Sequence, residues 1–426
     1  MLFLYRVITN LIIIFSPIIV LIRLLKKKEH PIRFLEKFCK FSKKRGTGKL
    51  IWFHGASVGE ILSIIPLIEK LEKDKDIKRI LITSTTLSSS YIISKLKLKK
   101  TIHQFYPLDT NFLTKKFLSY WKPSLAIFVE SEIWPNMISN LKKELIPHIL
   151  LNARITKKSF TRWKMMPSFS KKLFKSFIFC YPQNQDSKKF LKLLGVEKIK
   201  YIGNLKFSEN EKKSKKTNNR LDKFLKDRKF WCASSTHEGE EITAALTHLD
   251  LQKKYNKLVT IIIPRHIQRV EKIKNSIQKL GLKVHKHSSL KKINPKTNIY
   301  LVDTYGETKS FFRICKTVFL GGSLINHGGQ NPIEAARFGC KVIHGPNINN
   351  FKEIYDLLEK NSLTTKIKNR NDLTKVVNKL FNSKLKSLNL IKKIKQLGDS
   401  ILNDTTLEIN TLIKKNEIKK TKILGL

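Results

Sequence analysis

The sequence predicts an α/β protein with two domains, each built on a parallel sheet covered by helices. Three observations lead to this prediction. Short apolar runs alternate with amphipathic stretches along most of the chain, a pattern typical of strand–helix–strand units. A polar segment at residues 208–228 interrupts the alternation near the middle. Small and polar residues recur directly after the apolar runs, where open parallel sheets bind their ligands.

The N-terminal half supplies the first set of these elements. Apolar runs predict strands at residues 50–53, 80–83, 124–129 and 147–151. Apolar residues at helical spacing predict helices at residues 61–73 and from Pro135 to about residue 143. Strands thus alternate with helices, so the half is expected to fold as a Rossmann-like domain.

The C-terminal half repeats the same rhythm without repeating the sequence. Strands are predicted at residues 229–233, 258–263, 298–302, 317–320 and 341–344. Helices are predicted at residues 238–248, 267–280, 332–338 and 355–360. The chain after residue 371 is predicted to be a basic helical tail that packs back on the body.

An apolar segment precedes both halves. Residues 7–22 carry no charge, with Arg6 before them and Arg23 and three lysines after them. The run is shorter than the roughly 20 residues of a typical spanning helix, and Pro17 interrupts it. No small-residue cleavage site follows, which disfavours a signal peptide. A core helix is one alternative, and a membrane anchor with a cytoplasmic basic flank is the interpretation that fits best.

These elements predict five regions. They are an anchor at 1–28, an N-terminal Rossmann-like domain at 29–207, a polar linker at 208–228, a C-terminal Rossmann-like domain at 229–371 and a tail at 372–426.

Composition limits the class of partner. The formal net charge of +51 favours anionic partners such as acidic lipids or phosphorylated substrates, although an even spread of lysines also fits a compositional bias. No base-reading pattern occurs, so nucleic acid is not an expected partner. The five cysteines are scattered and form no C-x-x-C pair. This spacing argues against a disulfide framework and against a zinc site.

The most informative segment is glycine-rich. The predicted strand at 317–320 runs into Gly-Gly-Ser at 321–323, and Gly-Gly-Gln-Asn-Pro-Ile-Glu follows at 328–334. Glycines allow close backbone approach, and a helix starting at Pro332 would offer unpaired N–H groups to a phosphate. Glu334 would then reach a sugar hydroxyl of the same ligand. The alternative is a tight connection without a ligand.

Polar motifs also follow strands of the N-terminal half. His-Gly-Ala-Ser-Val-Gly-Glu at 54–60 places Glu60 at a helix start, where it is either a cap or a general base. Glu-Ser-Glu-Ile-Trp-Pro-Asn at 130–136 brings two carboxylates to the end of another strand. Asn-Ala-Arg at 152–154 follows a third strand, and Lys206 lies just before the linker.

Similar motifs follow strands of the C-terminal half. They are Ser-Ser-Thr-His-Glu-Gly-Glu at 234–240, Pro-Arg-His at 264–266 and Tyr-Gly-Glu at 305–307. The Ser and Thr residues have an ordinary role as helix caps, and Arg265 is either a phosphate ligand or a surface charge. Because the motifs share one topological position, together they predict a nucleotide-sugar site in a cleft between the domains.

In their order, these motifs resemble the Kdo (3-deoxy-D-manno-octulosonic acid) transferases of lipopolysaccharide synthesis. The matching segments are HGASVGE, ESEIWPN, NAR, GNLKF, ASSTHEGEE, PRH, VDTYGE and GGSLINHGGQNPIEAARFG. The resemblance implies a GT-B fold and an inverting transfer of Kdo from CMP-Kdo to the lipid A precursor, lipid IVA. It also implies the cytoplasmic face of the bacterial inner membrane, with a single N-terminal anchor on its anionic surface, and no metal or other cofactor.

The resemblance also assigns residues. Glu60 would be the catalytic base, and Glu130 and Lys206 would stabilise the transition state, with Glu132 as the competing carboxylate. The CMP contacts would be Pro264, Arg265, Tyr305, Gly306, Glu307, Asn331, Pro332, Ile333 and Glu334. The chain departs from many members by having Gln330 in place of His and Tyr305 in place of Met, which bears on the details of the donor site.

Two other functions remain as alternatives. One is a GT-B enzyme that uses another nucleotide sugar, such as a UDP-sugar epimerase or transferase. The other is a basic membrane or nucleic-acid binding protein without catalytic activity, which leaves the ordered strand-end motifs unexplained.

Overall fold

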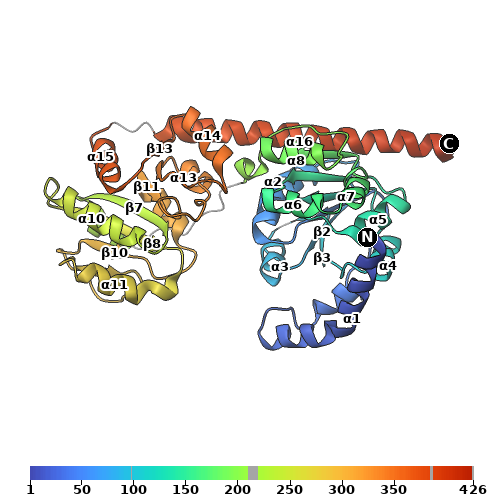
Figure 1. Ribbon diagram of the computed structural model, residues 1–426, viewed down its shortest axis with the longest axis horizontal. Coiled ribbons are helices and arrows are strands. Elements are labelled where there is room, and N and C mark those ends of the chain that lie inside the picture. Colours follow the sequence, from blue (N-terminus) through green and yellow to red (C-terminus); the bar gives the residue numbers. More distant parts are fainter. Residues whose placement is uncertain (97, 210–218, 384–386, 425–426) are drawn as a thin grey trace. The chain divides into compact units, whose positions relative to one another are not determined.

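The computed structural model describes residues 1–96, 98–209, 219–383 and 387–424 (Figure 1). The chain divides into two compact units. Unit 1 comprises Met1–Asn210 and Leu397–Leu426, and unit 2 comprises Glu211–Gln396. Within the predicted linker, residues 210–218 lie outside the described residues, whereas Asn219–Leu225 forms helix α9 of unit 2. The two parallel sheets confirm the predicted α/β fold with two Rossmann-like domains.

Unit 1 is built on a parallel sheet with the strand order β3-β2-β1-β4-β5-β6. Its strands are β1 Leu50–His54, β2 Arg79–Ser84, β3 Thr101–Phe105, β4 Leu125–Val129, β5 His148–Ala153 and β6 Phe179–Pro182. Its helices are α1 Leu2–Leu25, α2 Val58–Leu71, α3 Leu87–Ser94, α4 Asn111–Trp121, α5 Pro135–Lys143, α6 Lys157–Lys164, α7 Pro167–Phe174 and α8 Gln185–Leu193, with 3₁₀ turns at Arg33–Phe38 and Leu205–Ser208.

The central strands of unit 1 are buried on both faces. All residues of β1 and β4 are buried, as expected for a parallel sheet that helices cover on both sides. On one face, the rings of Trp52 and Phe117 lie 4.9 Å apart and those of Trp52 and Phe128 lie 5.4 Å apart. This aromatic packing anchors β1 and β4, whose ends carry the predicted catalytic residues.

Unit 2 repeats the architecture with the strand order β13-β12-β11-β7-β8-β10-β9. Its strands are β7 Lys229–Thr236, β8 Leu258–Pro264, β9 Val284–Lys286, β10 Ile299–Leu301, β11 Thr317–Leu320, β12 Lys341–His344 and β13 Thr364–Lys366. Its helices after α9 are α10 Glu240–Gln252, α11 Val270–Gln278 after a 3₁₀ turn at Ile267–Arg269, α12 Thr308–Ile314, α13 Ile333–Arg337, α14 Lys352–Lys360 and α15 Arg370–Phe381.

Each sheet has a topological switch point, where the connections leave in opposite directions. It lies between β1 and β4 in unit 1 and between β7 and β11 in unit 2. Ligands of open parallel sheets bind at the carboxyl ends of the strands at this point. Glu60 and Glu130 follow the two switch strands of unit 1, and His237 and Gly321 follow those of unit 2.

Helix α1 has two different faces. Its large apolar side chains are mostly exposed, and by length and composition the helix is able to cross a membrane. The opposite face contacts unit 1: Tyr5 donates a hydrogen bond to Asp109 (2.9 Å), Arg6 donates one to Asn136 (3.1 Å), and Ile13 packs against the hydrophobic core. The helix is therefore fixed to the rest of unit 1 along one side, and its other side is apolar.

The long helix α16 (Ser387–Leu424) begins in the range of unit 2 and continues into unit 1. In unit 1, Gly398 lies so close to Phe207 that an added Cβ would approach its carbonyl oxygen to 2.3 Å. Further along, Glu408 accepts a hydrogen bond from Tyr181 (3.1 Å) and pairs with Lys200. The helix thus supports the segment that contains Lys206.

Candidate active site

Glu60 caps helix α2 and also faces other carboxylates. Its carboxylate accepts hydrogen bonds from the backbone N–H groups of Ala56 (2.6 Å) and Ser57 (3.3 Å), and the Ser57 hydroxyl accepts one from the N–H of Glu60. This capping box starts the helix at Val58, three positions before the predicted start. Burial raises the pKa of Glu60, and the negative charges of Glu132 and Glu130 raise it further. Glu60 is therefore a cap whose proton affinity suits a general base.

Glu130 and Lys206 form a buried ion pair. The Lys206 ammonium lies 2.6 Å from the Glu130 carboxylate, and the two side chains are 18% and 7% exposed. Glu130 has a φ of +56°, which non-glycine residues seldom adopt. Its backbone is held there by hydrogen bonds to Leu151 and from Arg154. The two residues predicted to act together are thus in direct contact.

The Asn152 motif explains how Lys206 reaches this position. Asn152 also has a positive φ, +51°, and its side-chain oxygen accepts a hydrogen bond from the N–H of Leu205 (3.1 Å). Asn204 in turn accepts one from the N–H of Lys206 (2.9 Å). The end of β5 therefore holds the 3₁₀ turn that presents Lys206.

Glu132 has a different environment from Glu130. Its carboxylate lies 3.1 Å from Nε2 of the buried His54 and accepts a hydrogen bond from the Trp134 indole (2.8 Å). Burial on its own would raise the pKa of Glu132, but these hydrogen bonds and the charge of His54 lower it overall. Nδ1 of His54 lies 2.9 Å from the Thr83 hydroxyl, which fixes the ring. Glu132 is thus engaged by His54 and Trp134, whereas Glu130 pairs with the predicted catalytic lysine.

In unit 2, the glycine turn after β11 is already occupied by a carboxylate of the chain. The buried Glu240 accepts hydrogen bonds from the N–H groups of Gly322 (2.7 Å), Ser323 (3.2 Å) and Leu324 (3.1 Å), and also from that of His237 (2.9 Å). Two of these donors, the N–H groups of Gly322 and Ser323, belong to the turn that was expected to hold a phosphate. The predicted phosphate cradle at this turn is therefore corrected: the turn is a structural clamp between β7 and β11.

The predicted donor contacts on the other strands lie at the same edge of the sheet. Pro264 ends β8, and the N–H of Arg265 donates to Thr236 (3.0 Å) at the end of β7. The Arg265 side chain is exposed and forms no ion pair with any carboxylate of the described residues. Tyr305 is 65% exposed, and its hydroxyl accepts a hydrogen bond from Gln268 (3.2 Å). Gly306 has a φ of +86°, and Glu307 caps α12 without a side-chain hydrogen bond.

The helix predicted at residues 332–338 is shorter in the structure. Helix α13 has five residues and begins at Ile333, so Pro332 is its N-cap. The Asn331 side chain accepts a hydrogen bond from the N–H of Ile333 (3.1 Å). Glu334 is half-buried and lies 3.3 Å from the Lys309 ammonium. This pairing shows that Glu334 points toward α12.

Several residues that make these contacts in the two units were given no role of their own in the sequence analysis. They are His54, Asn152, Asn204, His237, Glu240 and His327. All lie within the quoted motifs, so their place in the sequence could have pointed to them. Some of their partners lie far away in the sequence, such as Leu205 for Asn152 and Gly322 for Glu240, and such pairing has no local sequence pattern.

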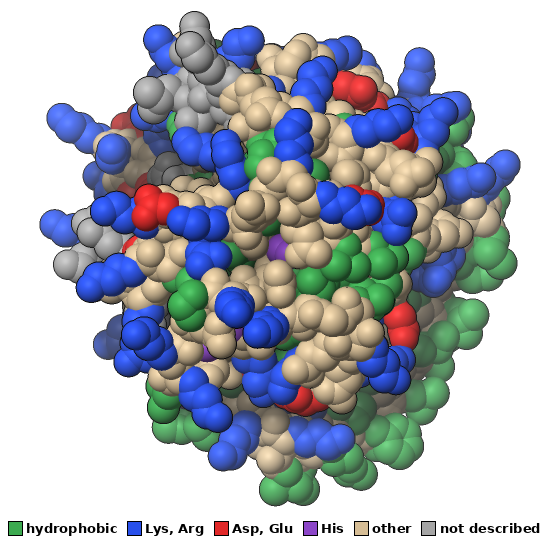
Figure 2. Space-filling view, turned by 90° about the vertical axis from the view of Figure 1, so that its left-hand side faces the viewer, with side chains coloured by type: hydrophobic (Ala, Val, Ile, Leu, Met, Phe, Trp, Pro, Cys, Tyr) green, Lys and Arg blue, Asp and Glu red, His purple; other side chains and the backbone are tan. Residues whose placement is uncertain are grey.

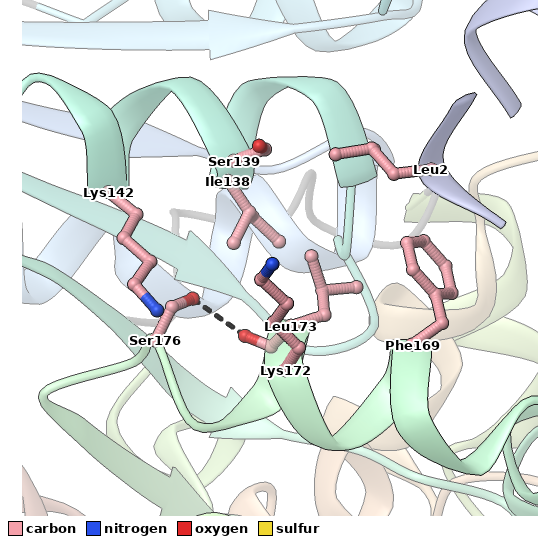
Figure 3. A pocket seen from close by; sticks show the side chains of 8 residues that line it. All are labelled: Leu2, Ile138, Ser139, Lys142, Phe169, Lys172, Leu173 and Ser176. Carbon is pink, nitrogen blue, oxygen red and sulfur yellow. Dashed lines mark hydrogen bonds between the residues drawn. The ribbon is translucent and has the colours of Figure 1, made fainter.

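Two surface features lie outside these groups. A pocket of about 90 Å³ in unit 1 is lined by Leu2, Ile138, Ser139, Lys142, Phe169, Lys172, Leu173 and Ser176 (Figure 3). It lies between the first turn of α1 and helices α5 and α7, and none of the predicted site residues lines it.

Lys and Arg side chains are spread over the face shown in Figure 2 rather than gathered in one patch.

Comparisons with known proteins agree on one family. Residues 32–209 match the family model described as 3-Deoxy-D-manno-octulosonic-acid transferase (kdotransferase). A probable mitochondrial 3-deoxy-D-manno-octulosonic acid transferase of Arabidopsis thaliana is 35% identical over 397 residues, covering 89% of each chain. The 3-deoxy-D-manno-octulosonic acid transferase of Rickettsia typhi is 35% identical, covering 78% of this chain and 72% of its own.

Solved structures show the same fold. A putative UDP-N-acetylglucosamine 2-epimerase from Listeria monocytogenes superposes with a TM-score of 0.61 at 13% identity, covering 87% of this chain and 98% of its own. At this identity the likeness concerns the two-domain GT-B architecture, not the reaction.

Proposed function

The chain belongs to the 3-deoxy-D-manno-octulosonic acid (Kdo) transferase family of glycosyltransferases, and we propose that it moves Kdo from CMP-Kdo to the lipid A precursor, lipid IVA, with inversion. The observation that carries this proposal is the group of acidic and basic side chains at the switch point of unit 1. There, Glu60 has a raised pKa next to the Glu130–Lys206 ion pair.

In the proposed reaction, Glu60 removes the proton from the acceptor hydroxyl. Because burial, and then the neighbouring carboxylates, raise the pKa of Glu60, it holds that proton more firmly than an ordinary glutamate. The hydroxyl then attacks the anomeric carbon of Kdo as CMP leaves. Lys206, which contacts Glu130, is proposed to meet the negative charge of the Kdo carboxylate.

The donor is proposed to bind unit 2 through Pro264, Arg265, Tyr305–Glu307 and Asn331–Glu334. The exposed Arg265 guanidinium suits a phosphate because its planar fork donates two parallel hydrogen bonds. Since the leaving group departs as a phosphate anion, cationic side chains supply the stabilisation. The proposal includes no metal ion and no other cofactor.

Competition between nucleotides tests the donor. Transfer by the full-length chain is expected to be inhibited by CMP and not by UDP at equal concentration. A transferase that uses a UDP-sugar predicts the reverse order, and an epimerase predicts no transfer. Inhibition by UDP without inhibition by CMP would therefore contradict the proposed donor.

Membrane attachment is proposed to occur through the exposed face of α1, at the cytoplasmic face of the inner membrane. The triple substitution of Leu11, Phe15 and Ile18 with Ser is expected to release the chain from anionic vesicles, since each side chain contributes about 1.5–3 kcal/mol when buried. These residues are 54%, 59% and 59% exposed in the free chain. Flotation with vesicles measures the effect.

The matched control for this experiment is Leu145→Ser, because Leu145 is 84% exposed on unit 1 outside α1. The control is expected to float with the vesicles as the wild type does. Equal flotation of the triple variant and the wild type would contradict attachment through α1.

A further inference from the structure

Three histidines gather at the switch point of unit 2. His237 follows β7, His266 follows β8, and His327 lies in the loop after β11. The ring of His237 lies 4.0 Å from that of His327 and 5.8 Å from that of His266, measured between centroids. Three different strands thus bring their imidazoles together at the edge where open sheets bind ligands.

The cluster lies among further nitrogen donors. Nε2 of Gln330 lies 3.3 Å from Nε2 of His237. Arg265 and Arg269 are close enough to His237 to act on its charge. Because imidazole, guanidinium and amide N–H groups are hydrogen-bond donors, the arrangement suits an anion.

The nearby carboxylates are already engaged. Glu240 accepts hydrogen bonds from four backbone N–H groups, including that of His237. Glu241 pairs with Arg269 at 3.1 Å, and the exposed Glu238 pairs with Lys272 at 2.6 Å. No carboxylate of the described residues forms an ion pair with the three imidazoles.

We propose that His237, His266 and His327 form a subsite that binds an oxyanion of the donor, its phosphate or its sugar carboxylate, and takes up a proton as it does so. The proposal rests on the proposed function, since it concerns the donor of that reaction. Two of the three rings are accessible, because His327 and His266 are exposed, while His237 is only 8% exposed.

The direction of the pH dependence follows from the environment of His237. Burial, and then the positive charges of His327, His266, Arg265 and Arg269, lower its pKa to about 4, so the free ring is neutral near pH 7. A bound oxyanion offsets these charges and raises the pKa. The bound ring therefore holds a proton that the free ring lacks, and affinity increases as the pH falls through the bound-state pKa.

The experiment compares wild type, His237→Gln and His285→Asn, each as the full chain in detergent. His285 is a partly buried histidine of unit 2 that packs against Tyr300, outside the cluster, and serves as the matched control. The probes are CMP, measured by calorimetry in two buffers with different ionisation enthalpies, and CMP-Kdo, measured by its KM as a function of pH.

Wild type and His285→Asn are expected to take up a proton on binding, with up to about tenfold tighter binding per unit fall in pH relative to His237→Gln. A difference with both probes identifies the phosphate, and a difference with CMP-Kdo alone identifies the sugar carboxylate. Equal proton uptake and equal pH profiles for His237→Gln and wild type would overturn the subsite. Wild type that binds CMP but transfers nothing would instead overturn the proposed function, and wild type that binds no CMP would overturn both.

Discussion

Replacing Glu60 with Gln is expected to lower kcat by about 10²- to 10⁴-fold, the usual contribution of a positioned general base. Glutamine at this position is able to keep the capping box with Ser57, so helix α2 retains its start. The variant therefore separates the two roles of Glu60, which Glu60→Ala would remove together. Steady-state kinetics and thermal unfolding of the same preparation measure the two effects.

The control for this substitution is Thr156→Ala, which removes the cap of helix α6 in the same unit. It is expected to cost about 1 kcal/mol of stability and to leave the transfer rate unchanged.

The wild-type rate is also expected to fall as the pH drops through the raised pKa of Glu60, because the protonated carboxyl cannot accept a proton. A Glu60→Gln variant with wild-type kcat would contradict the role of Glu60 as base.

Replacing Lys206 with Met is expected to destabilise unit 1 by about 3–5 kcal/mol, because it leaves the Glu130 carboxylate buried without its partner. Glu130 is 7% exposed in the pair. Adding Glu130→Gln to this variant removes the stranded charge and is expected to recover much of the stability, but not the activity. Denaturant unfolding and transfer assays of both single variants and the double variant measure this cycle.

The cycle distinguishes a catalytic pair from a structural one. If the ion pair served only to hold the fold, the stable double variant would regain transfer. If each single variant were as stable as wild type, the pair would not be buried as the structure has it.

The positions of the catalytic candidates follow from patterns that the sequence makes visible. Glu60 and Glu130 each come directly after an apolar run, and in a parallel sheet such runs end at one edge. Knowing the strands is therefore sufficient to predict that these residues share a surface. The start of α2 was missed by three positions because its cap is Ser57, before the first apolar residue of the helical pattern.

The features that could not be predicted from the sequence depend on contacts between distant segments of the chain. The carboxylate that fills the glycine turn comes from Glu240, in a different strand connection from Gly322. Strand β3 was not predicted because its residues, which include His103 and Gln104, are too polar for the apolar pattern of a central strand; it lies at the edge of the sheet. Neither the positive φ of Asn152 nor its hydrogen bond to Leu205 has a local signature.

The central claim is that the chain transfers Kdo to a lipid acceptor. Mass analysis of the lipid after incubation of the full chain with CMP-Kdo and lipid IVA tests it most directly. The expected product is heavier by one or more Kdo residues, and no such product is expected with Glu60→Gln. Lipid IVA of unchanged mass, under conditions where the wild type binds CMP, would contradict it.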